Sequence, residues 1–327
     1  MRHLCSLPAC VLLCSLAWAE VYQSSDGAKL WTPAGLGQVR VIGLAAHPQD
    51  PAVCFALAGK YSSPETVYRT VDQGKSWTKI QTPFAPLCLV VEPRDRERIW
   101  MGGREGAFAV SEDRGGTWRS GTLGEAAQSA VFQDGRLMNV CGLAFLGETV
   151  LAVGGQGRGF VASSSDCGKS WKRIESAQAG YCWAVALAKG ALLVGGDHGL
   201  LVSTDAGKTF AAEKAAQEKP GVGGRFSLSP DGATVVYSFR GDVLLSQDGG
   251  RQWSILPRIA EGTFLDSVVW HEGEALGLVQ EGVFHEEGGF RFFQASGTAH
   301  LYRSRDLKTW NKARTPENRV PVALSQG

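Results

Sequence analysis

The stretch Ser111-Glu-Asp113-Arg-Gly115-Gly-Thr-Trp118 contains the pattern that decides the fold, Ser/Thr-x-Asp-x-Gly-x-x-Trp, which we call the box. Residues 203–210 end in phenylalanine instead of tryptophan, residues 24–31 have the glycine one place early, and residues 304–310 are one residue short. With the full copies, the chain carries seven boxes, at residues 24–31, 70–77, 111–118, 164–171, 203–210, 246–253 and 304–310.

The boxes recur at the spacing of a β-propeller. Their aspartates are 39 to 58 residues apart, and most copies follow two short apolar runs. A period in the forties with short strands is typical of a four-stranded propeller blade. The residues concerned are Asp26, Asp72, Asp113, Asp166, Asp205, Asp248 and Asp306, and the aromatic residues Trp31, Trp77, Trp118, Trp171, Phe210, Trp253 and Trp310.

The chemistry of the box predicts a structural role. Asp and Ser side chains hydrogen-bond to nearby backbone N–H groups and hold turns, and glycine adopts backbone angles that other residues resist. We expect the indole to pack against its own blade and fix the hairpin. Because a calcium loop needs several oxygen ligands close together, we interpret the seven aspartates as turn residues and not as calcium ligands or catalytic acids.

The number of boxes predicts an all-β propeller of seven four-stranded blades, with six as the alternative. The first box is preceded by a single strand of the mature chain, so its inner strands must come from the other end, where Val320–Leu324 offers one. A ring closed by strands from both termini has no exposed sheet edges.

The N-terminus has the features of an export signal. Arg2 and His3 precede an apolar run to Ala19, and Ala17-Trp18-Ala19 fits the small-x-small rule for cleavage before Glu20. We therefore predict a signal peptide at 1–19 and a single propeller domain at 20–327, periplasmic or secreted. An N-terminal membrane anchor stays an alternative, although the run is short for a span.

Composition limits the class of partner. Lys and Arg number 33 and Asp and Glu 32, and a protein that grips a polyanion would show a basic excess. Nucleic acid is therefore not an expected partner. Five cysteines follow the leader: Cys54, Cys88, Cys141, Cys167 and Cys182. Since Cys88, Cys141 and Cys182 each lie in an apolar run, we expect buried thiols, with a disulfide such as Cys54–Cys88 as the alternative.

The box is that of the Asp-box or BNR repeat. Together with the glycines before it, as in Gly195–Phe210, it resembles the photosystem II stability/assembly factor family of seven-bladed propellers over roughly residues 21–313. Sialidases, xyloglucan-degrading glycosidases and sortilin-type receptors look similar at this level. The resemblance to assembly factors implies a protein partner, bound through a basic surface patch.

Two regions are candidates for partner binding on the rim opposite the boxes. Arg104, Arg136 and Arg158 lie in predicted loops on that side. Around Gly288-Gly289, a predicted hairpin carries Phe284, His285, Arg291 and Phe292. The phenylalanines are either core residues of the last blade or an exposed flap that anchors a partner.

No convergent set of catalytic residues stands out. Glycoside hydrolysis needs two opposed carboxylates, and no spacing singles out such a pair. The histidines are scattered, so neither a metal nor a cofactor is expected. We therefore predict an exported, monomeric, non-catalytic scaffold for a protein partner such as a membrane-protein client. The alternative is an exported carbohydrate-active enzyme of the sialidase or another glycoside hydrolase type.

Overall fold

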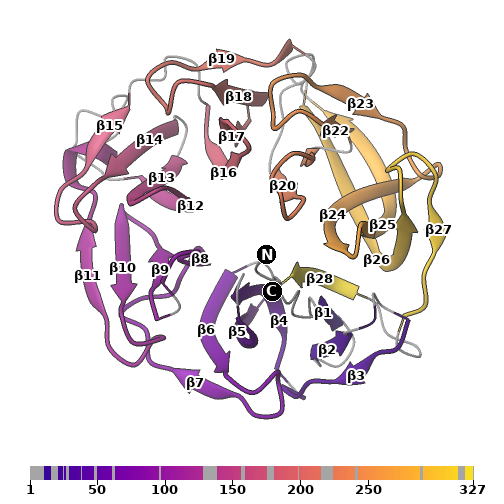
Figure 1. Ribbon diagram of the computed structural model, residues 1–327, viewed down its shortest axis with the longest axis horizontal. Helices are drawn as coiled ribbons and strands as arrows, with labels where there is room; N and C mark the ends of the chain where they lie inside the picture. The colour runs from indigo at the N-terminus through magenta and orange to yellow at the C-terminus, as the bar shows by residue number, and fades with distance from the viewer. Residues whose placement is uncertain are drawn as a thin grey trace, which may run out of the picture.

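The chain forms a ring of β-sheets. A computed structural model describes residues 11–15, 21–24, 26, 29–37, 39–47, 50–60, 63–95, 97–127, 138–155, 159–174, 180–197, 199–214, 224–239, 242–287, 290–315 and 321–326. In these residues, seven antiparallel sheets of four strands stand around a common axis (Figure 1). The predicted seven-bladed propeller is confirmed.

In six blades the strands run in chain order from the axis outward. Blade two has β4 (Val41–His47), β5 (Asp50–Lys60), β6 (Ser63–Thr70) and β7 (Thr78–Ile80). Blade three has β8 (Cys88–Val91), β9 (Ile99–Gly102), β10 (Ala107–Ser111) and β11 (Arg119–Thr122), followed by a 3-10 turn, η1 (Gly124–Ala127). Blade four has β12 (Asn139–Leu146), β13 (Thr149–Gly155), β14 (Gly159–Ser164) and β15 (Lys172–Ile174).

The remaining three blades complete the ring. Blade five has β16 (Cys182–Ala188), β17 (Ala191–Gly196), β18 (Gly199–Ser203) and β19 (Ala211–Ala212). Blade six has β20 (Arg225–Leu228), β21 (Val235–Phe239), β22 (Asp242–Ser246) and β23 (Ser254–Leu256). Blade seven has β24 (Thr263–His271), β25 (Glu274–Glu287), β26 (Phe290–Ser304) and β27 (Asn311–Lys312).

Blade one is built from both ends of the chain. Its order is β28 (Pro321–Gln326), β1 (Val11–Ser15), β2 (Val21–Ser24) and β3 (Thr32–Pro33), with β28 innermost. The predicted closure by mixed termini is confirmed. The second strand differs from the expectation that the inner strands come from the C-terminus. It is Val11–Ser15, which lies inside the predicted leader. Cleavage after Ala19 stays a prediction.

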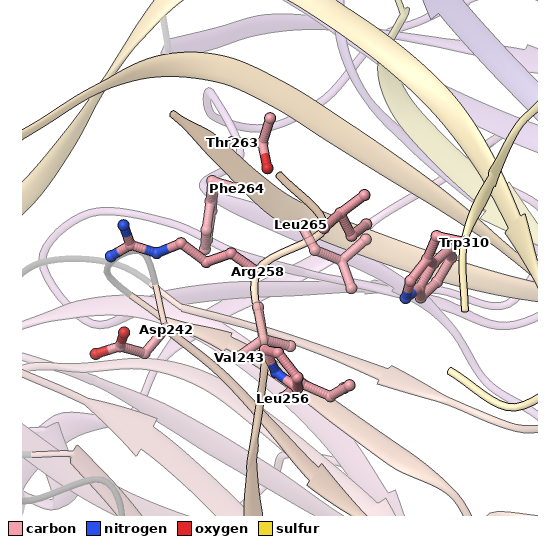
Figure 2. Close-up of a pocket in the computed structure, with 10 residues that line it drawn as sticks. Asp242, Val243, Leu256, Arg258, Thr263, Phe264, Leu265 and Trp310 are labelled. Atoms are coloured by element: carbon pink, nitrogen blue, oxygen red, sulfur yellow. The ribbon is translucent and has the colours of Figure 1, made fainter. Parts of the chain in front are cut away.

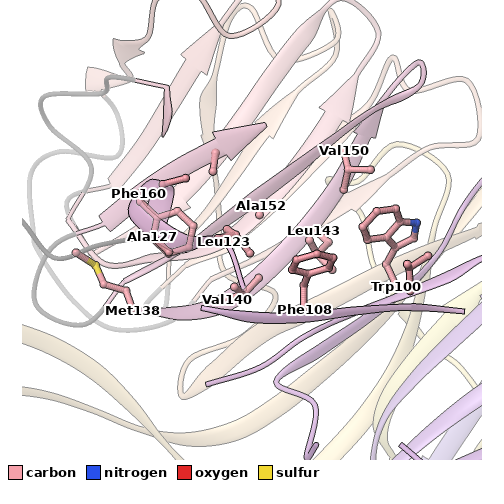
Figure 3. Packing of buried hydrophobic residues seen from close by; sticks show 13 residues of the cluster. Trp100, Phe108, Leu123, Ala127, Met138, Val140, Leu143, Val150, Ala152 and Phe160 are labelled. Atoms are coloured by element: carbon pink, nitrogen blue, oxygen red, sulfur yellow. The ribbon is translucent and has the colours of Figure 1, made fainter. Parts of the chain in front are cut away.

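The middle strands of the blades are apolar because both of their faces are covered. Every residue of β9 and of β17 is buried. A strand covered on both faces shows a continuous apolar run and not the alternation of a half-exposed strand. Between blades three and four, Trp100, Phe108 and Phe160 fill such a core (Figure 3).

The box is a hydrogen-bonded turn built around its carboxylate. In the third box, Ser111 Oγ donates to Asp113 Oδ1 at 2.7 Å, and the N–H of Thr117 donates to the same oxygen at 2.8 Å. The hydroxyl of Thr117 donates to Asp113 Oδ2 at 2.7 Å. Gly115 has φ +90, and a Cβ there would lie 2.9 Å from Ile80 Cδ1. The predicted turn chemistry is present in the box.

The boxes make stability depend on pH. The N–H of Thr117 and the hydroxyls of Ser111 and Thr117 lower the pKa of Asp113 from 3.8 to about 2. Hydrogen bonds of the same kind lower the pKa values of the other box aspartates, and those of Asp72 and Asp205 also reach about 2. A carboxyl whose pKa is lower in the folded than in the unfolded chain stabilises the fold above the unfolded value.

We therefore expect the free energy of unfolding to fall as the pH drops from about 4 to about 2. Urea midpoints measured at half-unit pH steps test this expectation. The control is Asp113→Asn, which removes one titrating group and should flatten the profile slightly. A midpoint that is level between pH 4 and pH 2 would contradict the assigned role of the carboxylates.

The aromatic residue of each box packs between two blades, so the expected contact with its own blade is present and is joined by a contact with the preceding blade that was not predicted. Trp118 of blade three contacts a cluster that includes Phe55 and Ile80 of blade two as well as Leu89 of its own blade. The ring of Trp171 lies 5.3 Å from that of Phe108, in the preceding blade. The side chain therefore joins its blade to the one before it.

The five cysteines after the leader are all free thiols, so the alternative Cys54–Cys88 disulfide is not present. Burial raises the pKa of Cys88 to about 12 and that of Cys182 to about 12. Of the three thiols expected to be buried, Cys182 is buried, whereas Cys88 and Cys141 are half-buried. The described residues contain no helix long and apolar enough to cross a bilayer.

Candidate partner-binding rim

The antiparallel topology assigns the turns to two rims. Within a blade, the first-to-second and third-to-fourth turns lie at one end, and the second-to-third turn lies at the other. The boxes are third-to-fourth turns, so they share one rim, which we call the box rim. The opposite rim carries the second-to-third turns and the connections between blades, and we call it the loop rim.

A long hairpin extends from the loop rim of blade seven. The inner strand β24 pairs with β25 up to the pair Thr263 and Glu281, whereas β25 and β26 continue to pair as far as Glu287 and Phe290. The predicted hairpin is confirmed, although Gly288-Gly289 lies outside the described residues. Gly282 stands at its base, where a Cβ would come within 2.2 Å of Gln294 O.

One face of the hairpin is anchored to its own blade. Phe284 and Phe293 are paired across the strands, with ring centroids 4.8 Å apart. The ring of Phe264 in β24 lies 5.4 Å from that of Phe293, and the guanidinium carbon of Arg258 lies 4.0 Å above the ring of Phe284. Phe284 is therefore packed against its blade, in line with the interpretation as core.

The residues that alternate with Phe284 and Phe293 along the two strands form the other face of the hairpin. By register, Val283 stands opposite Gln294, and His285 opposite Phe292. The side chain of Val283 is 60% exposed, and Gln294 is also exposed. Arg291 pairs with Glu286 in the backbone ladder. The side chains of Arg291 and Phe292 lie outside the described residues, so their roles stay predictions.

Of the three predicted arginines, the structure describes only Arg104, and this residue does not lie beside the hairpin. Arg104 is exposed in the turn between β9 and β10, on the loop rim, but in blade three. Blades three and seven lie on opposite sides of the ring (Figure 1). Arg136 and Arg158 lie outside the described residues. A basic patch that joins the three arginines therefore stays a prediction.

A pocket between blades six and seven was missed from the sequence. It is small, with a cavity volume of about 20 Å³, and apolar side chains such as Val243, Leu265 and Trp310 line it (Figure 2). Asp242 and Arg258 lie among its polar residues, and Asp242 is the one carboxylate among its described lining residues. Its residues come from separate blades, so no single stretch of sequence signals it.

A second group of residues meets on the inner strands of blades four and five. The thiol of Cys141 lies 3.2 Å from the Tyr181 hydroxyl, and the ring of Tyr181 lies 3.8 Å from that of Trp183. Burial and the neighbouring thiol raise the pKa of Tyr181 well above 10.0. Burial also raises the pKa of the Cys141 thiol, so the environment of the pair disfavours the anionic form of both groups.

Known proteins of different functions share the fold. No protein-family model matches the chain. The chain is similar to a structure of YCF48 bound to a D1 peptide, at 16% identity and a TM-score of 0.55, over 83% of this chain and 85% of that one. It is also similar to the GH74 xyloglucanase from Xanthomonas campestris, at 16% identity and a TM-score of 0.59, over 95% of this chain and 60% of that one.

A short segment also matches a curated protein. Vacuolar protein sorting/targeting protein 10 from Laccaria bicolor is 35% identical over 75 residues, which is 23% of this chain and 5% of that protein. The chain thus spans a small part of that relative and less than two thirds of the xyloglucanase. The predicted resemblance to Asp-box propellers is confirmed at the level of the fold.

Proposed function

We propose that this protein is an exported, non-catalytic propeller that binds a protein partner through its loop rim, with the hairpin of blade seven as the principal contact. The observation that carries the proposal is the exposed face around Val283 on a hairpin whose opposite face is anchored. An exposed apolar side chain on a rigid element can contact a partner at low conformational cost.

The anchoring makes the hairpin suited to recognition. Phe284 and Phe293 hold it through Phe264, and Arg258 covers the ring of Phe284. A strand pair fixed on one side presents its other side in one conformation, so less entropy is lost on binding. The peptide in the YCF48 structure supports a protein partner for this propeller as well. We further propose that the partner belongs to a membrane complex and that this protein aids the assembly or stability of that complex.

Export and lack of catalysis belong to the same proposal. The apolar run to Ala19 supports export. Lack of catalysis is supported by the box aspartates, whose oxygens accept hydrogen bonds from their own turns, and by the presence of only one carboxylate among the described lining residues of the pocket. A monomer fits a ring whose seven blades all come from a single chain.

The substitution Val283→Glu is expected to weaken partner capture roughly tenfold, because it places a charge in the proposed contact. The measurement is the amount of partner recovered by affinity purification from membranes of the native host. The matched control is Ile255→Glu, since Ile255 is also a strand residue with 60% exposure but lies on the outer strand of blade six. Equal capture by both variants, or no partner for the parent chain, would refute the proposal.

A second candidate is an exported carbohydrate-active enzyme, which the similarity of the fold to the GH74 xyloglucanase favours. Turnover of aryl-glycosides or polysaccharides by the purified protein would support it. Loss of that turnover in Asp242→Asn would assign the reaction to the pocket. Activity that persists in this variant would direct the search to another carboxylate.

A further inference from the structure

The second strand of the closing blade coincides with the apolar part of the predicted leader. Val11–Ser15 forms β1 in the full-length chain, and the predicted cleavage site follows at Ala19. The strand β1 therefore belongs to the precursor, and a protein that is cleaved after Ala19 lacks it.

Within the blade, β1 has a partner on each side. It pairs antiparallel with β2, from Val11 opposite Ser24 to Cys14 opposite Val21. It pairs antiparallel with β28 on the other side, beginning with Val11 opposite Gln326. Both neighbours remain in a chain that begins at Glu20. Removal of β1 therefore leaves two strand edges that face each other across about two strand spacings, roughly 9.5 Å.

Strand β28 is held away from β2 by the inner ring. It contacts β4 of blade two and β24 of blade seven, the innermost strands on either side of it (Figure 1). A shift by one strand position would bring it to β2, but would remove it from both of these neighbours. The open position is thus more favourably filled by a new strand than by movement of β28.

We propose that processing after Ala19 opens a strand-wide slot in blade one, and that the mature protein accepts an extended apolar peptide of its partner there. The peptide would take the place of Val11–Ser15 and run antiparallel to both β2 and β28. Unpaired strand edges are templates for such addition, and main-chain hydrogen bonds supply much of the affinity.

The slot defines the chemistry of its occupant. Since every interior residue would direct its N–H to β2 or to β28, the peptide must lack proline. The segment that fills the position in the full-length chain, Val-Leu-Leu-Cys-Ser, indicates about five residues of mainly apolar character. That the natural peptide belongs to the partner rests on the proposed function, and the slot lies in the blade next to the hairpin.

The test uses the processed protein purified from the compartment to which it is exported. The probe is a synthetic peptide of residues 9–16 with Cys10→Ser and Cys14→Ser, and the control adds Leu13→Pro. At about 100 times its Kd, the probe is expected to raise Tm by roughly 5 °C, and the proline peptide should leave Tm unchanged. An intact mass that begins at Glu20 should accompany this result.

Two results would overturn the inference: a processed protein whose Tm the probe does not change, or an exported protein that still carries residues 11–15. Because this assay needs no partner, it separates the two proposals. A rise in Tm without partner capture would refute the proposed function and leave the slot in place. Capture without a rise in Tm would support the proposed function and refute the slot.

Discussion

Replacement of Trp118 by alanine is expected to lower the free energy of unfolding by about 3 kcal/mol. The indole fills a core between blades two and three, against residues that include Phe55 and Leu89. Removal of the ring leaves a cavity that both blades would have to close together. Thermal unfolding should show a Tm lower by roughly 6 °C.

The matched control is Trp118→Phe, because the chain itself places Phe210 at the equivalent position of the fifth box. The indole N–H of Trp118 has no hydrogen-bond partner in the described structure, so its loss should cost little. We expect a decrease of about 1 kcal/mol for this variant. An alanine variant with the Tm of the parent would contradict the assigned packing.

Replacement of Gly154 by alanine is expected to destabilise blade four by about 3 kcal/mol or more. A Cβ at this position would lie 1.8 Å from the carbonyl oxygen of Asn139 and 3.0 Å from the ring of Phe160. The first contact is with the backbone of the paired strand β12, beside its bulge at Val140 and Gly142. A rotamer change cannot relieve it, so the two strands must separate.

Gly37→Ala is the control, since no atom lies within 4 Å of the Cβ that it would add. That variant should stay within about 0.5 kcal/mol of the parent. Urea unfolding of both variants gives the comparison. If Gly154→Ala unfolds at the midpoint of the parent, the close approach of β12 and β13 is not present in solution.

The fold could be predicted because the box is local chemistry repeated seven times. The bonds around Asp113 join residues at most four places apart, so sequence spacing alone defines them. The packing partner of Trp118 could not be predicted in this way. An aromatic residue at the end of a box can reach its own blade or the preceding one, and the choice depends on how blades are placed in space.

The candidate site was predicted in part, for the same physical reason. Gly288-Gly289 between apolar residues predicted the hairpin, since turn and strand preferences are local. The anchoring of Phe284 by Arg258 depends on two segments that meet only in the folded ring. The second strand of blade one was missed because Val11–Ser15 has the composition of a leader, and a buried strand has the same composition.

The position of the box aromatics has a consequence for how such rings change over evolutionary time. The aromatic side chain at each interface between blades belongs to the later blade and packs against the earlier one, so each blade carries the residue that joins it to its neighbour. Duplication of one blade would then create a new interface with the same type of packing as the existing ones. Rings of different blade number can in this way descend from one another without a newly invented core.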